Sequence, residues 1–146
     1  MEKERKELKA FSILILAFVA IELIRAVVEL CVNGIPQIPN IPADIQQIFE
    51  TFMIVVFVIV LLFYIPEVYM GIKGIKVANN PTVRGRGHIV WAVIFIIFSI
   101  IGTISSVYEL TQVFNLDNAI NVIDPVVNLL VYIFYYRFAS KIADAR

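Results

Sequence analysis

The residue types that most often carry enzyme or metal chemistry are scarce in this sequence. Its 146 residues include one cysteine, Cys31, and one histidine, His88. One cysteine cannot form an internal disulfide or a thiol redox pair, and one histidine is too few for a histidine-rich metal site. No serine or cysteine nucleophile stands beside a histidine base. We therefore expect no metal site, no cofactor and no enzymatic activity.

The chain also lacks an excess of charge of either sign. Lys and Arg together number 12, and Asp and Glu together also number 12. No basic stripe is interleaved with aromatic residues, as would be typical of a nucleic-acid interface. No Walker motif for nucleotide phosphates is present. We expect no nucleic-acid partner.

Apolar residues, in contrast, are abundant and make up 60% of the chain. A soluble domain of this size could not bury so much apolar surface, so a bilayer is the expected solvent. Four apolar segments of roughly 20 residues are each long enough to cross about 30 Å as a helix. Their Ile and Val content would favour strands in water, but backbone groups in lipid must satisfy their own hydrogen bonds. We predict one all-α domain, an integral membrane four-helix bundle, with spans at about 9–33, 46–70, 88–111 and 119–142.

Basic residues lie almost entirely on one side of these predicted spans. The loops 34–45 and 112–118 contain no Lys or Arg, and Arg25 is the one basic residue that does not lie at or near the opposite ends of the spans. The positive-inside rule then predicts an antiparallel up-down-up-down topology with both termini in the cytoplasm. The eleven flanking residues are Lys3, Arg5, Lys6, Lys9, Lys73, Lys76, Arg84, Arg86, Arg137, Lys141 and Arg146.

The first segment has a second interpretation. A basic start followed by FSILILAFVAI is also typical of a secretory signal peptide. No small-x-small cleavage site follows, and residues 21–32 continue the helical pattern. We therefore interpret the segment as a retained span.

Two loops have a distinct composition. NGIPQIPNIPAD places Ile-Pro at a spacing of three, which favours an extended, polyproline-like outer connector; a partner-binding surface is the alternative. Asp44 is the expected cap of the second helix. The loop 71–87, GIKGIKVANNPTVRGRG, is basic and rich in turn residues. We expect it to contact anionic lipid headgroups, with about 1 kcal/mol for each Lys or Arg.

The stretch GIKGIKVANNP, followed by a short basic segment and a new apolar helix, resembles a pattern found in small four-span membrane proteins of Gram-positive bacteria. The likeness covers roughly residues 70–105, and those families are mostly of unknown function. It implies a multi-pass protein of the bacterial plasma membrane and no particular activity. Nothing matches the motifs of small multidrug exporters or of thiol-oxidising four-helix proteins, which need cysteine pairs.

Three charged residues lie inside the first apolar segment. Glu22, Arg25 and Glu29 are spaced by three and four residues, so they share one helix face. A charge near the bilayer centre costs at least roughly 2.5–3.5 kcal/mol, which favours inward orientation and pairing. Glu22 lies about 20 Å above the predicted inner boundary, at the same height as Asp124 in the fourth segment. We expect this face to meet the fourth segment and Arg25 to pair with the carboxylates.

Further polar residues of the predicted outer half complete a candidate site. We expect a polar cavity that opens outward and is closed toward the cytoplasm by apolar packing, with at least one carboxylate protonated or bound to a cation. The alternative is a structural network that only sets helix register. The candidate residues are Glu22, Arg25, Glu29, Glu50, Thr103, Ser106, Glu109, Asn121, Asp124 and Asn128.

Polar and aromatic residues of the predicted inner half receive simpler interpretations. Glu67, next to Pro66, is expected to reach toward Lys73 or lipid headgroups near the inner interface. His88 and Tyr135 are expected to anchor the bundle at the interface, together with Trp91 and Tyr136.

Two functions fit these observations. The first is an accessory or binding module that takes a lipid, a peptide or a membrane-protein partner in its outer cavity. The second is a proton- or cation-coupled transporter or channel subunit that works as a homo-oligomer, because intramembrane carboxylates are typical of ion paths. Apart from Glu67, Tyr132 and Tyr135, the inner half offers no polar route, which favours the binding module.

Overall fold

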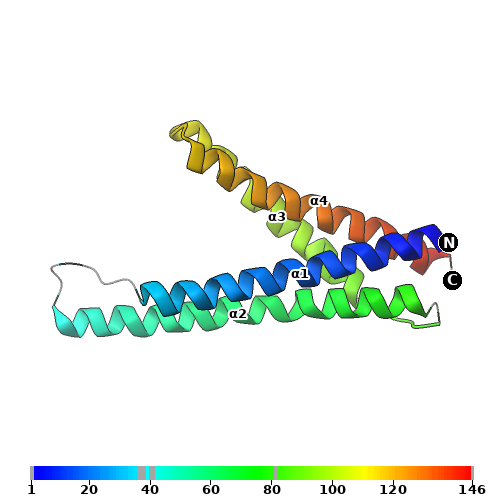
Figure 1. Cartoon of the computed structure of the whole chain (residues 1–146), viewed down its shortest axis with the longest axis horizontal. Coiled ribbons are helices and arrows are strands. Elements are labelled where there is room, and N and C mark those ends of the chain that lie inside the picture. Colours follow the sequence, from blue (N-terminus) through cyan, green and yellow to red (C-terminus); the bar gives the residue numbers. More distant parts are fainter. Residues whose placement is uncertain (1, 36–38, 40–41, 81, 146) are drawn as a thin grey trace.

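The computed structural model describes residues 2–35, 39, 42–80 and 82–145, and its only regular elements in these parts are four α-helices (Figure 1). Each helix contains a stretch long and apolar enough to cross a membrane, which confirms the predicted class. Most of the Ile-Pro repeat, for which an extended conformation was predicted, lies outside the described residues. The helices are α1 (Glu2–Asn33), α2 (Ala43–Asn79), α3 (Gly87–Gln112) and α4 (Leu116–Asp144).

The second helix is longer than the sequence predicts. It continues to Asn79 instead of ending near Met70, so most of the predicted loop 71–87 is helical. The glycines that indicated a turn are close-packing positions. A Cβ atom at Gly71 would lie 2.5 Å from Leu16 of α1, closer than side chains approach in real structures. Tertiary packing therefore overrides the weak helix propensity of glycine here.

The helix ends also differ from expectation in one place. Pro42, not Asp44, occupies the N-cap of α2, and Asp44 lies in the first turn, where its negative charge favours the helix dipole. In α4 the N-cap is Asn115, whose side-chain oxygen accepts a 2.7 Å hydrogen bond from the backbone N–H of Asn118.

The helices form two hairpins that meet at one end only (Figure 1). α1 packs mainly against α2 and α3 mainly against α4, with fewer contacts between the two hairpins. The hairpins converge at the end that carries both termini and diverge toward the other end. The structure therefore differs from a uniform four-helix bundle, because all four helices pack together only in the terminal half.

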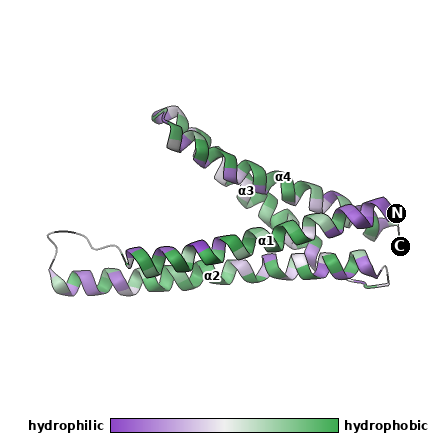
Figure 2. Ribbon diagram, in the orientation of Figure 1, coloured by the Kyte–Doolittle hydropathy of each residue, from purple (hydrophilic) through white to green (hydrophobic). Residues whose placement is uncertain are grey.

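The buried core lies in this terminal half. Elsewhere large apolar side chains are exposed, such as Ile24 and Ile104, each 64% exposed. Figure 2 shows apolar ribbon over the middle and diverging parts of all four helices. Such continuous exposure would be unfavourable in water and is typical of lipid-facing helices. The buried hydrophobic cluster consists of Leu8, Ile15, Met70, Val77, Ala78, Ala92, Phe95, Val131, Tyr132, Tyr135, Ala139 and Ile142.

Two residues predicted as interface anchors belong to this core. Tyr135 is 0% exposed, and its hydroxyl donates a 2.7 Å hydrogen bond to the backbone carbonyl of Met70. His88 is 2% exposed, and its ring packs edge-on against that of Tyr135, with centroids 6.2 Å apart. The prediction was wrong for both, because continuation of α2 to Asn79 supplies helix surface that covers them.

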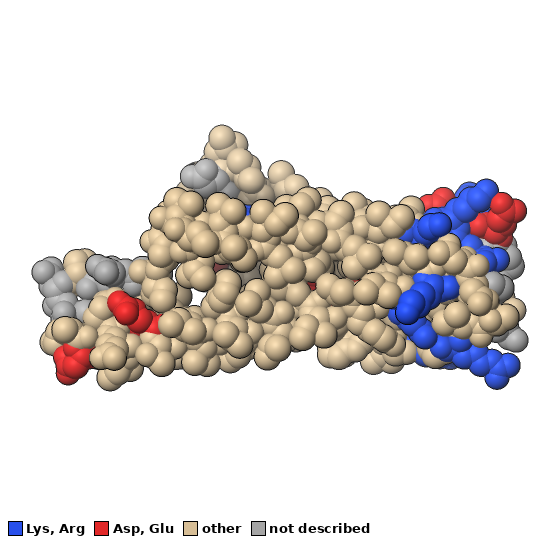
Figure 3. Space-filling model, turned by 60° about the horizontal axis from the view of Figure 1, so that its bottom comes forward, with Lys and Arg blue, Asp and Glu red and all other residues tan. Residues whose placement is uncertain are grey.

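Arginine side chains connect the helix ends in the terminal half. Arg5 donates from Nε to the carbonyl of Ala78 at 2.7 Å and from Nη2 to that of Asn79 at 2.9 Å, so α1 caps the C-terminus of α2. Arg86, just before α3, pairs with Asp144 at the end of α4 at 3.1 Å. On the face shown in Figure 3, Lys and Arg gather at this same end.

Candidate functional site

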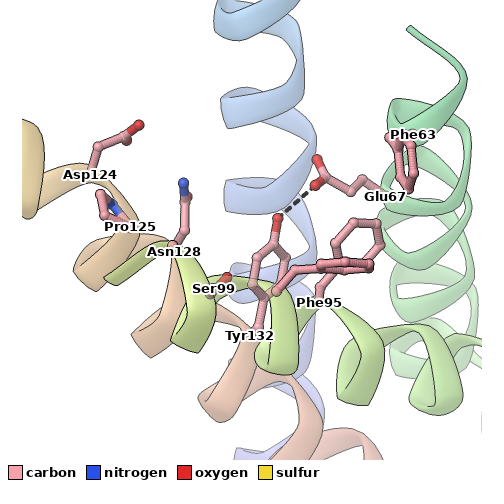
Figure 4. A pocket seen from close by; sticks show the side chains of 10 residues that line it. Phe63, Glu67, Phe95, Ser99, Asp124, Pro125, Asn128 and Tyr132 are labelled. Atoms are coloured by element: carbon pink, nitrogen blue, oxygen red, sulfur yellow. Dashed lines mark hydrogen bonds between the residues drawn. The ribbon is translucent and has the colours of Figure 1, made fainter. Parts of the chain in front are cut away.

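A cavity of about 420 Å³ lies between α2 and the α3–α4 hairpin, just beyond the buried core (Figure 4). We call it the inter-hairpin cavity. It forms where the hairpins begin to diverge, so side chains that would pack together in a uniform bundle instead border open space. Its lining residues are Phe63, Glu67, Phe95, Phe98, Ser99, Gly102, Asp124, Pro125, Asn128 and Tyr132.

A hydrogen bond between the two hairpins lies at one side of the cavity. The Tyr132 hydroxyl donates to Oε1 of Glu67 at 2.9 Å (Figure 4). Tyr132 is only 7% exposed, and its ring stacks on that of Phe95 with centroids 5.4 Å apart. The buried tyrosine therefore holds the Glu67 carboxylate at the cavity.

Glu67 does not take the interfacial role expected from the sequence. Its carboxylate accepts a hydrogen bond from α4 instead of reaching toward Lys73. The expectation placed the inner boundary near Met70, whereas α2 continues to Asn79 and carries Lys73 about 9 Å along the axis from Glu67. The signal that could have identified the site was the carboxylate itself, which stands within a strongly apolar part of the helix.

Aromatic rings form much of the remaining wall. Phe63 of α2 and Phe98 of α3 meet edge to face, with centroids 6.3 Å apart and an interplanar angle of 84°. Both are about half exposed and lie at the border of the cavity, whereas Phe95 and Tyr132 are buried. The sequence does not distinguish Phe63, Phe95 and Phe98 as wall residues, because apolar residues of a membrane span carry no signal that separates a cavity wall from a lipid-facing surface.

α4 contributes the other polar groups. Asp124 and Asn128 are spaced by four residues and, four residues further on, share their helix face with Tyr132. Both line the cavity. Pro125 lies within α4 and has no N–H, so the backbone carbonyl of Asn121 loses its usual intrahelical donor beside the cavity.

The charged face of α1 does not form the expected network. Among the described residues the ion pairs are Lys6–Glu2 and Arg86–Asp144, and neither involves Arg25. Arg25 and Glu29 are exposed. Glu22 is half-buried and lies within electrostatic range of Glu67.

Divergence of the hairpins explains this difference. In the terminal half, Phe11 of α1 stacks on Phe134 of α4 with ring centroids 5.4 Å apart. Arg25 lies two heptads along α1 from Phe11 and so on nearly the same face. Beyond the terminal half, however, α4 separates from α1, as Figure 1 shows. The spacing of Glu22, Arg25 and Glu29 places them on one face of α1, but the expected ion pair between Arg25 and Asp124 is not formed.

The other candidate residues make local contacts or lie away from the cavity. Glu50 accepts a 3.1 Å hydrogen bond from Gln46 Nε2, one turn earlier in α2. The Thr103 hydroxyl donates to the carbonyl of Ser99 at 2.7 Å, again within one helix. The remaining three are not lining residues of the cavity: Ser106, Glu109 and Asn121.

Comparison of the chain with protein-family models, curated proteins and solved structures gives no match. The chemistry of the site therefore rests on its own residues alone. In the described part of the chain, no group of three His, Cys, Asp or Glu side chains is placed to hold a metal ion. What the cavity offers is two carboxylates, an amide, two hydroxyls and aromatic walls.

Proposed function

We propose that this protein is a binding module of the bacterial plasma membrane and that the inter-hairpin cavity is its ligand site. The chain crosses the bilayer four times in an antiparallel arrangement, with both termini and the loop before α3 in the cytoplasm. The gathering of Lys and Arg at the end with both termini supports this orientation. The cavity then lies beyond the core on the outer side.

The observation that carries the proposal is the cavity itself, which is open and places polar groups among apolar walls at a level where the helices border lipid. A carboxylate in a span is costly unless a partner compensates for it. The hydrogen bond from Tyr132 compensates Glu67 only in part, because an ionised carboxylate has two acceptor oxygens. A ligand in the cavity would supply the remaining interactions.

The terminal half favours binding over transport through the protein. Between the cavity and the cytoplasmic end, the buried residues are almost all apolar, and the Tyr135 hydroxyl is engaged with Met70. No polar route past this core is evident among the described residues. Ligand would enter and leave on the outer side or laterally from lipid.

A second candidate function is a proton- or cation-coupled transporter subunit that acts as a homo-oligomer. The specific observation in its favour is the Glu67–Tyr132 hydrogen bond, a protonatable link between the two hairpins inside the membrane. Protonation of Glu67 would weaken this link and could change how far the hairpins diverge. This function ranks second, because the apolar core of the terminal half leaves no polar path for an ion in the part of the chain that the structure describes.

Contacts at the cytoplasmic side would orient the module. Arg84, Arg86 and His88 border a second space of about 360 Å³ near the end of α4. We propose that Arg84 and the neighbouring lysines of α2 contact anionic lipid headgroups there. These contacts would anchor the terminal half and leave the diverging hairpins free to receive a ligand.

Native mass spectrometry of gently extracted protein tests the proposed function. We expect a bound lipid or small molecule that is lost when Gly102→Leu places a large side chain in the cavity. Ser105→Leu is the matched control, because Ser105 is exposed on α3 and does not line the cavity. Equal retention in both variants, or no bound species in the unmodified protein, would contradict a ligand site in this cavity.

A further inference from the structure

We infer that the inter-hairpin cavity binds a lipophilic organic cation, such as a quaternary ammonium or phosphonium group that carries apolar substituents. The inference rests on the proposed function, because it names the ligand class of the same cavity. Three features of the lining support it: the sign of its charge, its aromatic walls and the way Glu67 is held.

The charge of the lining is negative. Glu67 and Asp124 are the two ionisable acids among the ten lining residues, and none of the ten is Lys, Arg or His. Arg25 does not pair with any acid among the described residues, so it is not the counter-charge of this group. In a membrane such a site favours a cationic ligand.

The aromatic walls favour an organic cation over a hydrated inorganic one. Phe63, Phe95 and Tyr132 border the cavity on the side of Glu67 (Figure 4), and Phe98 also lines it and packs edge to face against Phe63. The negative faces of aromatic rings attract cations within about 6 Å of the ring centroid, and aromatic enclosures are a common means of binding quaternary ammonium groups. Apolar substituents on the cation would cover the rings, which a strongly hydrated ion could not do.

The position of Glu67 leaves it able to meet a ligand. Its Oε1 accepts the hydrogen bond from Tyr132, whereas Oε2 accepts none from the described residues. Figure 4 shows the carboxylate extending between the rings and toward the side chains of α4. The volume of about 420 Å³ is within the usual range for small-molecule sites, roughly 300–1,000 Å³. Asp124 and Asn128 line the same cavity further along α4.

Isothermal titration calorimetry of the full chain in a neutral detergent tests the inference with two ions of nearly the same shape and opposite charge. Tetraphenylphosphonium is expected to bind, and tetraphenylborate is not. Glu67→Gln keeps an acceptor for Tyr132 and removes the charge, so we expect it to weaken phosphonium binding at least about tenfold. Phe98→Leu is expected to weaken binding by a smaller factor through loss of one ring. Asp44→Asn removes a carboxylate far from the cavity and should leave affinity unchanged.

The outcomes separate this inference from the proposed function. Equal binding of both ions, or unchanged affinity in Glu67→Gln, would overturn the cation site. In that case, a copurifying neutral ligand that is lost in Gly102→Leu would still support the binding module. Absence of phosphonium binding to folded protein would also overturn the cation site. Absence of any ligand in native mass spectra would, in addition, remove the proposed function. Preserved helical circular dichroism in each variant shows that a loss of binding is not a loss of folding.

Discussion

The hydroxyl of Tyr135 in α4 donates a 2.7 Å hydrogen bond to the carbonyl of Met70 in α2, and Gly74 makes room for that tyrosine one turn further along α2. A Cβ atom at Gly74 would lie 2.9 Å from the Tyr135 hydroxyl oxygen. Because Gly74 has no side chain, the Tyr135 hydroxyl can reach the Met70 carbonyl. The two hairpins are held together at this point, and the cavity opens beyond it.

Gly74→Ala should therefore destabilise the protein. The added methyl group would collide with Tyr135 and with the Ser12 hydroxyl, and such overpacking costs about 1–3 kcal/mol. This exceeds the gain of up to about 1 kcal/mol that alanine brings to a helix interior. Gly102→Ala is the control, because its Cβ would make an ordinary 3.8 Å contact with Pro125. Thermal unfolding in detergent should show a lower Tm for Gly74→Ala alone, and equal values would contradict the close approach.

Tyr135→Phe isolates the hydrogen bond from the packing. The ring stays and the hydroxyl is lost, so we expect a loss of about 1 kcal/mol in the free energy of unfolding. Tyr136→Phe is the matched substitution at the next residue, which is exposed. It should change stability by less than about 0.5 kcal/mol. Denaturant titration of both variants measures the difference, and equal effects would argue against a special role for Tyr135.

Arg5→Ala should loosen the C-terminal turn of α2. Arg5 satisfies the carbonyls of Ala78 and Asn79, which the helix itself cannot pair. Hydrogen exchange in the last turn of α2 should become faster, by about tenfold if the cap contributes about 1.4 kcal/mol. Lys6→Ala removes only an exposed ion pair with Glu2, and exchange in α2 should not change. Similar exchange in both variants would show that Arg5 does not cap α2.

Divergence of the hairpins can be measured with pairs of spin labels. Labels at positions 25 and 124 should be clearly farther apart than labels at 11 and 134, where the native rings stack with centroids 5.4 Å apart. Cys31→Ser removes the native thiol, which is exposed and would otherwise react. Double electron–electron resonance in lipid nanodiscs gives both distances. Similar distances for the two pairs would mean that the helices form a uniform bundle and that the inter-hairpin cavity is closed.

Local sequence information determined the helical, membrane-spanning character of this protein. Four apolar segments of sufficient length predict four spanning helices, because backbone groups in lipid have no other hydrogen-bond partners. The spacing of Glu22, Arg25 and Glu29 also determines that they share a helix face. Asp124 and Asn128 could be identified as polar groups of a cavity for the same reason: polarity inside an apolar segment is visible residue by residue.

Only the tertiary structure decided which of these groups meet. Helix periodicity reports the direction of a side chain but not the distance to the next helix, so it could not reveal that the hairpins diverge (Figure 1) or that Arg25 forms no ion pair with Asp124. The glycines of α2 signal a turn by propensity, and it is packing against α1 and Tyr135 that makes them helical. That extension of α2 packs against Tyr135, and the cavity forms beyond it, where the hairpins diverge. Contacts between residues about 65 positions apart depend on how whole helices pack, which no local pattern encodes.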